Sequence, residues 1–254
     1  MVNLNSLTQY LNTLLKTSQF TDYGPNGLQI EGTQEIKSVC FAVSATRASV
    51  EETVKRKAQA LIVHHGLFWK FHGVRTLTGP FAQRVFPLVR HHISLLGYHL
   101  PLDAHMEFGN AVSLGHLIPL SHMKPFGDHK GMPTGVKGTL VNPLPAHELK
   151  KQLELILHHS VLMSSPRPSE IIHSLGIITG GANSQWTFAY DEGLDAYLTG
   201  EMSEHDWHES QESDIHMFAG GHHATETFGI QKLMDHLSDK FSLECHYIPS
   251  DNPA

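Results

Sequence analysis

Short apolar runs that alternate with helix-length segments restrict the fold of this chain more than any other feature. The runs at 38–43, 60–63 and 94–98 are typical of strands, and segments with helical spacing at 49–58 and 81–92 lie between them. Strands that alternate with helices indicate βαβ units, in which helices cover a mostly parallel sheet on both faces. The sequence therefore predicts an α/β fold.

A second series of the same kind follows in the C-terminal half. Its predicted strands are 136–141, 174–179, 196–199, 215–219 and 241–247, and its predicted helices are 145–158, 184–191, 204–212 and 224–237. The two halves are similar in outline, which predicts two similar three-layer α/β lobes with mixed, mostly parallel sheets in a single functional unit. We expect lobe one at about 1–120, lobe two at about 135–254 and a connector rich in Gly, Pro and His at 121–134. Ligands would then converge from both lobes, because they gather at the carboxyl ends of strands.

The N-terminal segment predicts a docking helix followed by a turn. Leu4, Leu7, Leu11 and Leu15 follow the spacing of one helical face. Residues 23–28 then favour a turn, since Gly and Asn tolerate positive φ and Pro ends a helix.

Charge and cysteine content narrow the class of protein. The formal net charge of −7 argues against a chain that mainly binds a nucleic-acid backbone, although local basic patches leave nucleic acid open as a partner. No apolar run approaches the roughly 20 residues of a membrane helix, and the N-terminus lacks the layout of a signal peptide. Cys40 lies in an apolar run and Cys245 near the C-terminus, without metal-binding spacing. We expect a cytoplasmic protein with no membrane partner.

Histidine is the unusual residue, with 21 in 254 residues. Imidazole is the commonest metal ligand and titrates near neutrality, so the excess favours metal binding or proton transfer. Adjacent histidines alone are a weak signal, because His91-His92 and His158-His159 lie near the ends of predicted helices, where a cation stabilises the helix dipole.

The first candidate site follows the apolar run at 60–63, which ends in His64-His65-Gly66. Neighbouring side chains of an extended strand point to opposite faces, so both imidazoles serve one site only if the backbone turns, which Gly66 permits. The plain alternative is two unrelated polar residues in a loop. We favour metal ligands, because the apolar run stops abruptly at the pair.

The second candidate site repeats this arrangement after the run at 94–98. His99, Asp103 and His105 follow, with Pro101 between the first two. Asp103 is the strongest candidate, since a carboxylate can bridge two cations. His99 is equally a catalytic group or a partner that holds a carboxylate. His105 is explained as well by an exposed surface position.

The third candidate site is Gly220-Gly221-His222-His223-Ala224-Thr225-Glu226. If a helix begins near His222, then His222 and Glu226 share one face and can chelate one ion. A surface pair is the plain alternative. Glu201 ends another strand and fits a general base or a partner of a ligand, whereas the polar residues at 205–209 fit a solvated helix face.

Together these segments supply five nitrogen and oxygen ligands from three distant strand ends: His64, His65, Asp103, His222 and Glu226. Five ligands are too many for one structural zinc and enough for two ions that share a carboxylate or hydroxide. The prediction is a metal site between the two lobes.

The motifs as a set resemble the dinuclear metal-centre proteins related to NGG-interacting factor, which are also known as GTP cyclohydrolase I type 2 homologues. The resemblance spans nearly the whole chain and rests on five segments: 25–29, 63–66, 99–103, 199–201 and 221–226. It implies a two-lobed α/β fold, a pair of metal ions held by the same five residues, and a homohexameric ring, or toroid. The chain lacks a large inserted domain and so resembles the short bacterial form. Leu100-Pro101 stands where many relatives have Thr-Asn, which puts any role of that polar pair in doubt.

The expected function is a metal-dependent hydrolase that acts on a nucleotide-type substrate. In a GTP cyclohydrolase-like reaction, a metal-bound hydroxide would attack C8 of guanine, with Glu201 or His99 moving protons. The substrate comes from the resemblance alone, because the chain has no phosphate-binding P-loop. A non-enzymatic metal-binding or scaffold protein, for metal storage, delivery or regulation, is the alternative. Zn, Fe, Mn, Co and Ni all suit a set of histidines and carboxylates, so the identity of the two divalent ions stays open.

Overall fold

The computed structural model describes residues 1–254, which divide into two units by their contacts. Unit 1 comprises 1–102 and 229–250, and unit 2 comprises 103–228 and 251–254. The expected boundaries are therefore wrong: residues 121–134 belong to unit 2, and the predicted last strand belongs to unit 1. The reason is that β7 (Leu120–Phe126) pairs with a strand of unit 2, whereas β13 (Glu244–Tyr247) pairs with β4 (Ser38–Ser44) of unit 1.

The main sheet of unit 1 has the strand order β13-β4-β5-β6-β2. Here β5 (Ala60–His65), β4, β6 (Ser94–Gly97) and β13 run parallel, and β2 (Gly27–Ile30) pairs antiparallel with β6. Residues 23–28 were expected to form a turn, but residues 27–30 form this edge strand, while a short sheet joins β1 (Val2–Asn3) to β3 (Glu35–Ile36). The predicted mostly parallel sheet is confirmed for this unit.

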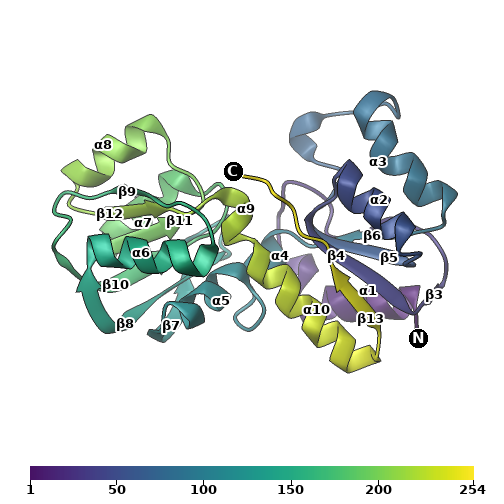
Figure 1. Cartoon of the computed structure of the whole chain (residues 1–254), viewed down its shortest axis with the longest axis horizontal. Coiled ribbons are helices and arrows are strands. Elements are labelled where there is room, and N and C mark those ends of the chain that lie inside the picture. Colours follow the sequence, from purple (N-terminus) through teal and green to yellow (C-terminus); the bar gives the residue numbers. More distant parts are fainter. The chain divides into compact units, whose positions relative to one another are not determined.

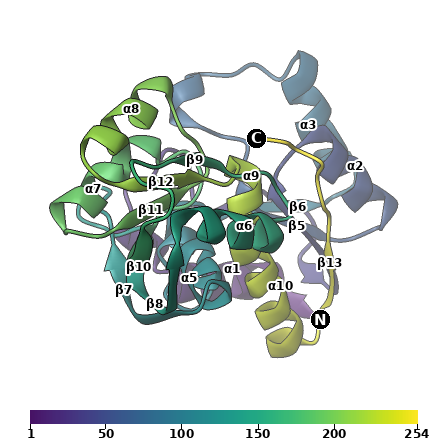
Figure 2. The same ribbon diagram turned by 60° about the vertical axis from the view of Figure 1, so that its left-hand side comes forward.

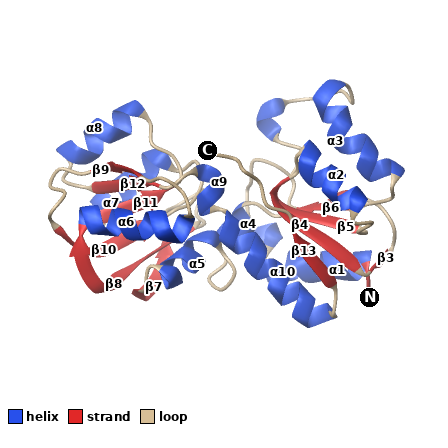
Figure 3. Ribbon diagram, viewed as in Figure 1, coloured by secondary structure: helices blue, strands red, loops and turns tan.

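Helices cover both faces of this sheet, as Figures 1 and 3 show. Val50 of α2 (Arg47–Lys55) and Leu88 of α3 (Gly79–Arg90) share a core with Cys40, Ala42 and Leu61 of the strands. The predicted N-terminal helix is α1 (Leu4–Leu14), which packs on α10 (Thr227–Phe241) through Tyr10 and Phe241. Because every residue of β4 before Ser44 is buried, the strand is apolar throughout rather than alternating.

The sheet of unit 2 has the order β7-β8-β10-β11-β12-β9. β10 (Ile171–Ile177), β11 (Ala196–Thr199) and β12 (His216–Ala219) run parallel, and the remaining strands, β7, β8 (Gly135–Pro145) and β9 (Leu162–Ser164), pair antiparallel. The expected mixed sheet is confirmed. It is less parallel than expected, because the segment predicted as a connector and the strand after it form an antiparallel hairpin.

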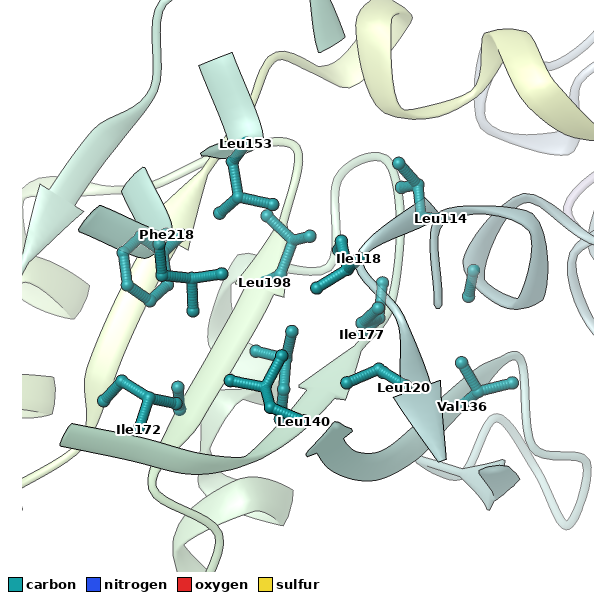
Figure 4. Close-up of a cluster of buried hydrophobic side chains, with 14 of the residues drawn as sticks. Leu114, Ile118, Leu120, Val136, Leu140, Leu153, Ile172, Ile177, Leu198 and Phe218 are labelled. Carbon is teal, nitrogen blue, oxygen red and sulfur yellow. The ribbon is translucent and has the colours of Figure 1, made fainter. Parts of the chain in front are cut away.

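Two cores flank this sheet, since successive residues of its strands face opposite sides. One core holds Leu198 and Phe218 against α5 (Asn110–Leu117) and α6 (Ala146–Leu157), as seen in Figure 4. The other holds Tyr197 and Met217 against α7 (Trp186–Asp191). Figure 2 shows α6 and α7 on opposite faces, with α8 (Glu204–Glu212) beside β9 and β12. Short helices complete the chain: α4 (Leu100–Asp103), α9 (His222–Thr225), and the 3₁₀ turns η1 (Thr17–Gln19), η2 (Lys70–His72) and η3 (Asn183–Gln185).

The two units repeat one topology. In unit 1 the order is β4-α2-β5-α3-β6, and in unit 2 it is β10-α7-β11-α8-β12; each third strand has an antiparallel neighbour, β2 and β9 respectively. The expected similarity of the two halves is thus confirmed. The equivalent strand ends are those of β5 and β11, and those of β6 and β12.

No helix of the chain is both long enough and apolar enough to cross a membrane.

Candidate metal centre

The end of β5 brings its two histidines together without a turn of the backbone. The strand continues through His65, which pairs with Ser44 of β4, so the expected turn before Gly66 is wrong. The rings of His64 and His65 nevertheless lie 4.6 Å apart between centroids. His99, which follows β6, completes the group: one ligand atom from each of His64, His65 and His99 lies within 4.8 Å of the others. We call these three residues the imidazole cluster.

The Nδ1 atom of each ring in the imidazole cluster lies within hydrogen-bond distance of an oxygen: the carbonyl of Tyr98 for His64 at 3.0 Å, Oγ of Ser44 for His65 at 3.1 Å, and Oδ1 of Asp22 for His99 at 2.7 Å. A carbonyl and an ionised carboxylate only accept hydrogen bonds, so His64 and His99 carry a proton on Nδ1. When such a ring is neutral, its lone pair lies on Nε2. This tautomer is the one that metal-ligating histidines adopt when an oxygen holds the other ring nitrogen.

Asp22, whose carboxylate contacts His99, is a residue that the sequence analysis did not single out. Besides the imidazole of His99, its carboxylate accepts the backbone N–H of Tyr23 at 2.6 Å and of Leu100 at 3.0 Å, and the side-chain amide of Asn26 at 2.8 Å. Burial favours the neutral acid, but the hydrogen bonds and charge of His99, with the hydrogen bonds of Asn26 and Tyr23, outweigh it and lower the pKa of Asp22 to about 2. Its place directly before the turn at 23–28 was the available signal.

The segment at 25–29 fixes the strand ends that carry the cluster. The side-chain amide of Gln29 donates to the carbonyl of Pro25 at 2.9 Å and accepts the backbone N–H of Leu67 at 2.9 Å. A Cβ on Gly66 would overlap that amide, so Gly66 is required for close packing. A cavity of about 10 Å³ lined by Gln29, His64 and His99 has room for about one water molecule.

In unit 2, His222 and Glu226 occupy one side of a short helix, as predicted. The helix α9 spans only His222–Thr225, with Glu226 as its C-terminal cap. Nε2 of His222 lies 3.3 Å from Oε2 of Glu226, and Nδ1 lies 2.5 Å from Oε1 of Glu201. The end of β11 therefore holds His222 through a carboxylate, as Asp22 holds His99 in unit 1.

The two carboxylates strongly perturb His222. Burial of the ring acts to lower its pKa, but the hydrogen bonds and negative charges of Glu226 and Glu201 outweigh burial and raise the pKa to about 9. The metal-free chain therefore carries a proton on this imidazole at neutral pH. A divalent cation can take the place of that proton, since it satisfies the same negative charge.

Asp103 completes the group in unit 2. A carboxylate oxygen of Asp103 lies within 4.8 Å of one of Glu226, and Oδ1 of Asp103 accepts the side-chain N–H of Asn110 at 2.8 Å. Asn110 is fully buried and was not predicted. We call Asp103, His222 and Glu226 the carboxylate cluster. Two carboxylates and an imidazole suit Zn, Mn, Fe, Co or Ni, so the donor set of this cluster fits a divalent metal ion.

Two glycines allow the backbone to approach the carboxylate cluster closely. A Cβ on Gly180, whose φ is +70°, would overlap Oε1 of Glu226. A Cβ on Gly200 would lie 2.6 Å from Cα of His222 and 2.7 Å from the carbonyl oxygen of Gly180. Side chains at these positions would displace Glu226 and His222. Gly200 in the 199–201 motif is therefore required for steric reasons, because any larger residue would collide with the backbone of His222.

The other histidines that the sequence singled out have local roles. His91 caps the C-terminal end of α3 and His158 that of α6, as predicted. His105 accepts the backbone N–H groups of Glu107 and Phe108 through Nδ1, each at 3.2 Å. These positions are turn and cap positions, so the histidine excess does not by itself mark the metal ligands.

Comparison with known families gives one match over nearly the whole chain. The model of the family described as Duf34/NIF3 (NGG1p interacting factor 3) matches residues 2–253. The chain is 39% identical over 253 residues to a "GTP cyclohydrolase 1 type 2 homolog" of Pasteurella multocida (strain Pm70), with 100% of both chains covered. It is 37% identical over 248 residues to the protein of the same name from Escherichia coli (strain K12), with 98% of both covered.

Solved structures agree with this match. A structure of the protein ybgI, described as of unknown function, is 35% identical and superposes with a TM-score of 0.94 over 100% of both chains. A protein of Thermus thermophilus is 27% identical and superposes with a TM-score of 0.89, again over 100% of both chains.

Proposed function

Because the chain belongs to the Duf34/NIF3 family, we propose that it is a metal-dependent hydrolase that holds two divalent ions. The proposed ligands are the five residues expected from the sequence: His64, His65, Asp103, His222 and Glu226. One observation carries the proposal. The imidazoles that have a fixed partner on Nδ1 are oriented as metal ligands are, and the two carboxylates that follow the strand ends supply the hard oxygen donors.

When bound, a pair of divalent ions lowers the pKa of water and polarises an electrophilic centre. The side chains around the proposed site orient its imidazoles. Asp22 fixes the proton of His99 on Nδ1, and Glu201 does so for His222. We assign Glu201 a positioning role, because its Oε1 atom contacts a proposed ligand. The side chain of Glu201 is 52% exposed, so it is accessible to water.

A nucleotide is the proposed substrate class, and its support is the shared name of the relatives together with an aromatic pair in unit 1. Trp69 stacks on Phe71 with ring centroids 5.6 Å apart, and Trp69 lies 5.0 Å from the ring of His99. Phe71 is 69% exposed, so a purine can stack on this pair beside the imidazole cluster. In the proposed reaction, water adds across the N7=C8 bond of a guanine nucleotide, with its hydroxyl on C8 and a proton on N7. The C8–N9 bond then breaks, the hydroxyl proton moves to N9, and C8 remains on N7 as a formyl group.

Metal content is the first test of this proposal. The wild-type chain, without a tag, should contain close to two ions per chain by elemental analysis, and Asp103→Ala and His222→Ala should each lose metal. His91→Gln is the matched control, because His91 caps α3 and lies outside both clusters. A content of one ion or none that the two substitutions leave unchanged would contradict the ligand assignment.

Activity requires a separate experiment. The metal-loaded chain is incubated with GTP, GDP and guanosine, and the loss of the intact purine ring is followed by chromatography. Turnover should disappear in His222→Ala prepared in the same way, which excludes a contaminating enzyme. Full metal content with no turnover on any nucleotide would favour the non-enzymatic alternative, a protein of metal storage, delivery or regulation. The hexameric ring stays a prediction, which sedimentation of the purified chain tests.

A further inference from the structure

The segment between β5 and α3 contains the longest run of exposed residues in the chain. Every residue of 70–80 is exposed, and the segment leads from the end of β5 to the start of α3 (Figure 1). Three of its large apolar side chains lie in solvent, since Phe71 is 69% exposed, Leu77 is 48% exposed and Val74 is fully exposed. Apolar side chains gathered in one exposed segment are typical of an interaction surface.

The same part of unit 1 carries charge of one sign. Residues 53–102 contain seven Lys and Arg and no Asp or Glu, although the net charge of the chain is −7. Unit 1 has 12 Lys and Arg against 8 Asp and Glu, whereas unit 2 has 6 against 17. The guanidinium groups of Arg75, Arg84 and Arg90 contact a ring or a carbonyl oxygen and no carboxylate. Their positive charge is therefore available to an anionic partner.

Aromatic rings lie next to these cations. Trp69 stacks on Phe71 with ring centroids 5.6 Å apart and an angle of 17° between the planes, and the ring of His72 lies 4.6 Å from that of Phe71. Nη1 of Arg75 lies 3.2 Å from Nδ1 of His72, and its Cζ atom lies 4.0 Å from the centroid of Phe81. We call Trp69, Phe71, His72, Arg75 and Phe81 the aromatic row, because each contacts the next through a flat group.

We propose that the aromatic row binds single-stranded nucleic acid. Unpaired bases present π-faces that stack on aromatic side chains, and the phosphates between them pair with Lys and Arg. A duplex fits this surface less well, since neighbouring base pairs cover the faces of its bases. A lipid surface would use the apolar side chains and the charge, but it gives no role to stacked rings.

The net charge of the whole chain argued against a protein that mainly binds a nucleic-acid backbone, and the distribution of charge removes that objection for unit 1. The excess of negative charge belongs to unit 2. The inference goes beyond the proposed function, because it requires neither a metal ion nor turnover. The two share only the Trp69–Phe71 pair, which is one end of the aromatic row.

The test measures the fluorescence anisotropy of labelled oligo(dT) and oligo(U) of about 20 nucleotides, titrated with the full chain. Neither probe contains guanine, so neither is a substrate of the proposed reaction. We expect a Kd of about 1–100 μM at about 50 mM salt, and weaker binding of a duplex of the same length. The tighter of the two single strands shows whether DNA or RNA is the preferred ligand.

Phe71→Ala tests the stacking. The loss of one base–ring contact should weaken binding about 5- to 100-fold without changing its dependence on salt. Tyr190→Ala removes an exposed ring from α7 of unit 2 and is the matched control, which should bind as the wild type does. Circular dichroism establishes that each variant is folded.

Arg75→Ala tests the charge. The slope of log Kd against log salt concentration should become shallower by about 0.7, which is the contribution of one phosphate contact on a single strand. Lys151→Ala removes an exposed positive charge from α6 of unit 2 and should leave the slope unchanged.

The inference is overturned if neither single strand binds, if a duplex binds as tightly as the single strands, or if Phe71→Ala binds them as the wild type does. Binding to vesicles of phosphatidylcholine and phosphatidylserine, with no binding to the oligonucleotides, would instead assign the segment to a lipid surface. A changed sedimentation coefficient in Phe71→Ala, with unchanged oligonucleotide binding, would assign it to contacts between copies of the chain. Because the probes contain no guanine, their failure to bind would leave the proposed hydrolase intact, and an absence of GTP turnover would leave this surface intact.

Discussion

Nδ1 of His99 lies 2.7 Å from Oδ1 of Asp22, a residue 77 positions earlier in the chain. This ion-pair geometry joins the turn after α1 to the end of β6. It holds the imidazole of His99 in one tautomer and one orientation. It also gives the buried carboxylate of Asp22 a hydrogen-bond donor in the interior of unit 1.

The contact between Asp22 and His99 predicts that the free energy of unfolding depends on pH in the acidic range. The folded pKa of Asp22, about 2, is below its ordinary value of 3.8, so its contribution is present above pH 3.8 and is lost as the pH falls through 2. The shift corresponds to about 2 kcal/mol. In the metal-free chain, the difference in free energy of unfolding between wild type and Asp22→Asn should shrink from pH 5 to pH 2 in denaturant titrations. Asp239→Asn, exposed on α10, should show no such trend, and a parallel trend in both variants would contradict the prediction.

Glu201→Gln should leave metal bound but more weakly. Because the substituted amide can still accept the N–H of His222 but carries no negative charge, metal affinity should fall about 10- to 100-fold while the stoichiometry at saturation stays unchanged. In the metal-free chain, the pKa of His222 should drop below its value of about 9, as followed by nuclear magnetic resonance. Glu204→Gln on α8, where the carboxylate contacts the exposed His208, is the control. Complete loss of one ion would instead make Glu201 a ligand.

Gly200→Ala should distort the carboxylate cluster. Its Cβ would meet the backbone of His222 at 2.6 Å and of Gly180 at 2.7 Å, and neither can move as a flexible side chain does. We expect a loss of about 1–3 kcal/mol in the free energy of unfolding, with weaker metal binding. Gly181→Ala is the matched control, since its Cβ would make ordinary contacts of 3.4 Å or more. Equal effects of the two substitutions would show that close approach at Gly200 is unimportant.

Asp206→Ala should destabilise unit 2 by about 3 kcal/mol, because it removes the acceptor of three hydrogen bonds, among them that of the buried indole of Trp186. Its carboxylate accepts the side-chain N–H of Asn183 at 2.7 Å, the indole N–H of Trp186 at 3.2 Å and the backbone N–H of Ser203 at 2.9 Å. Glu209→Ala, on the exposed face of the same helix, should change the free energy of unfolding by less than about 0.5 kcal/mol. Thermal and denaturant unfolding of the two variants would decide this, and a small effect at Asp206 would contradict the assigned network.

The pattern of apolar residues predicted where strands and helices lie better than it predicted which of them pack or pair together. The apolar runs at 38–43 and 60–63 became β4 and β5, because a strand buried on both faces must be apolar along its length. The assignment of β13 to the second lobe failed, because nothing in its composition shows that it pairs with β4, some 200 residues earlier in sequence. Asp206 was expected on a solvated face, since a charged residue within a polar helix gives no sign of the three donors that surround it in the folded chain.

In the candidate site, too, local sequence patterns revealed some residues and only the folded structure revealed others. The candidate histidines and carboxylates could be proposed from the sequence because each follows an apolar run, and strand ends are where such residues gather. Asp22, Asn110 and Gln29 were missed, since they act by hydrogen bonds to partners that only the folded chain brings near. Residues that orient a ligand carry no spacing rule of their own.

The division of unit 1 into 1–102 and 229–250 has a consequence for biosynthesis. A ribosome delivers the chain from its N-terminus, so every strand of the sheet in unit 2 emerges before β13 does. Until then, β4 is an uncovered edge strand with a row of unpaired backbone groups, which is a site of unwanted pairing. The unit whose synthesis begins first is therefore the unit that is completed last. A nascent chain stalled before residue 244 has all the strands of the sheet in unit 2 but lacks the edge strand β13 of unit 1.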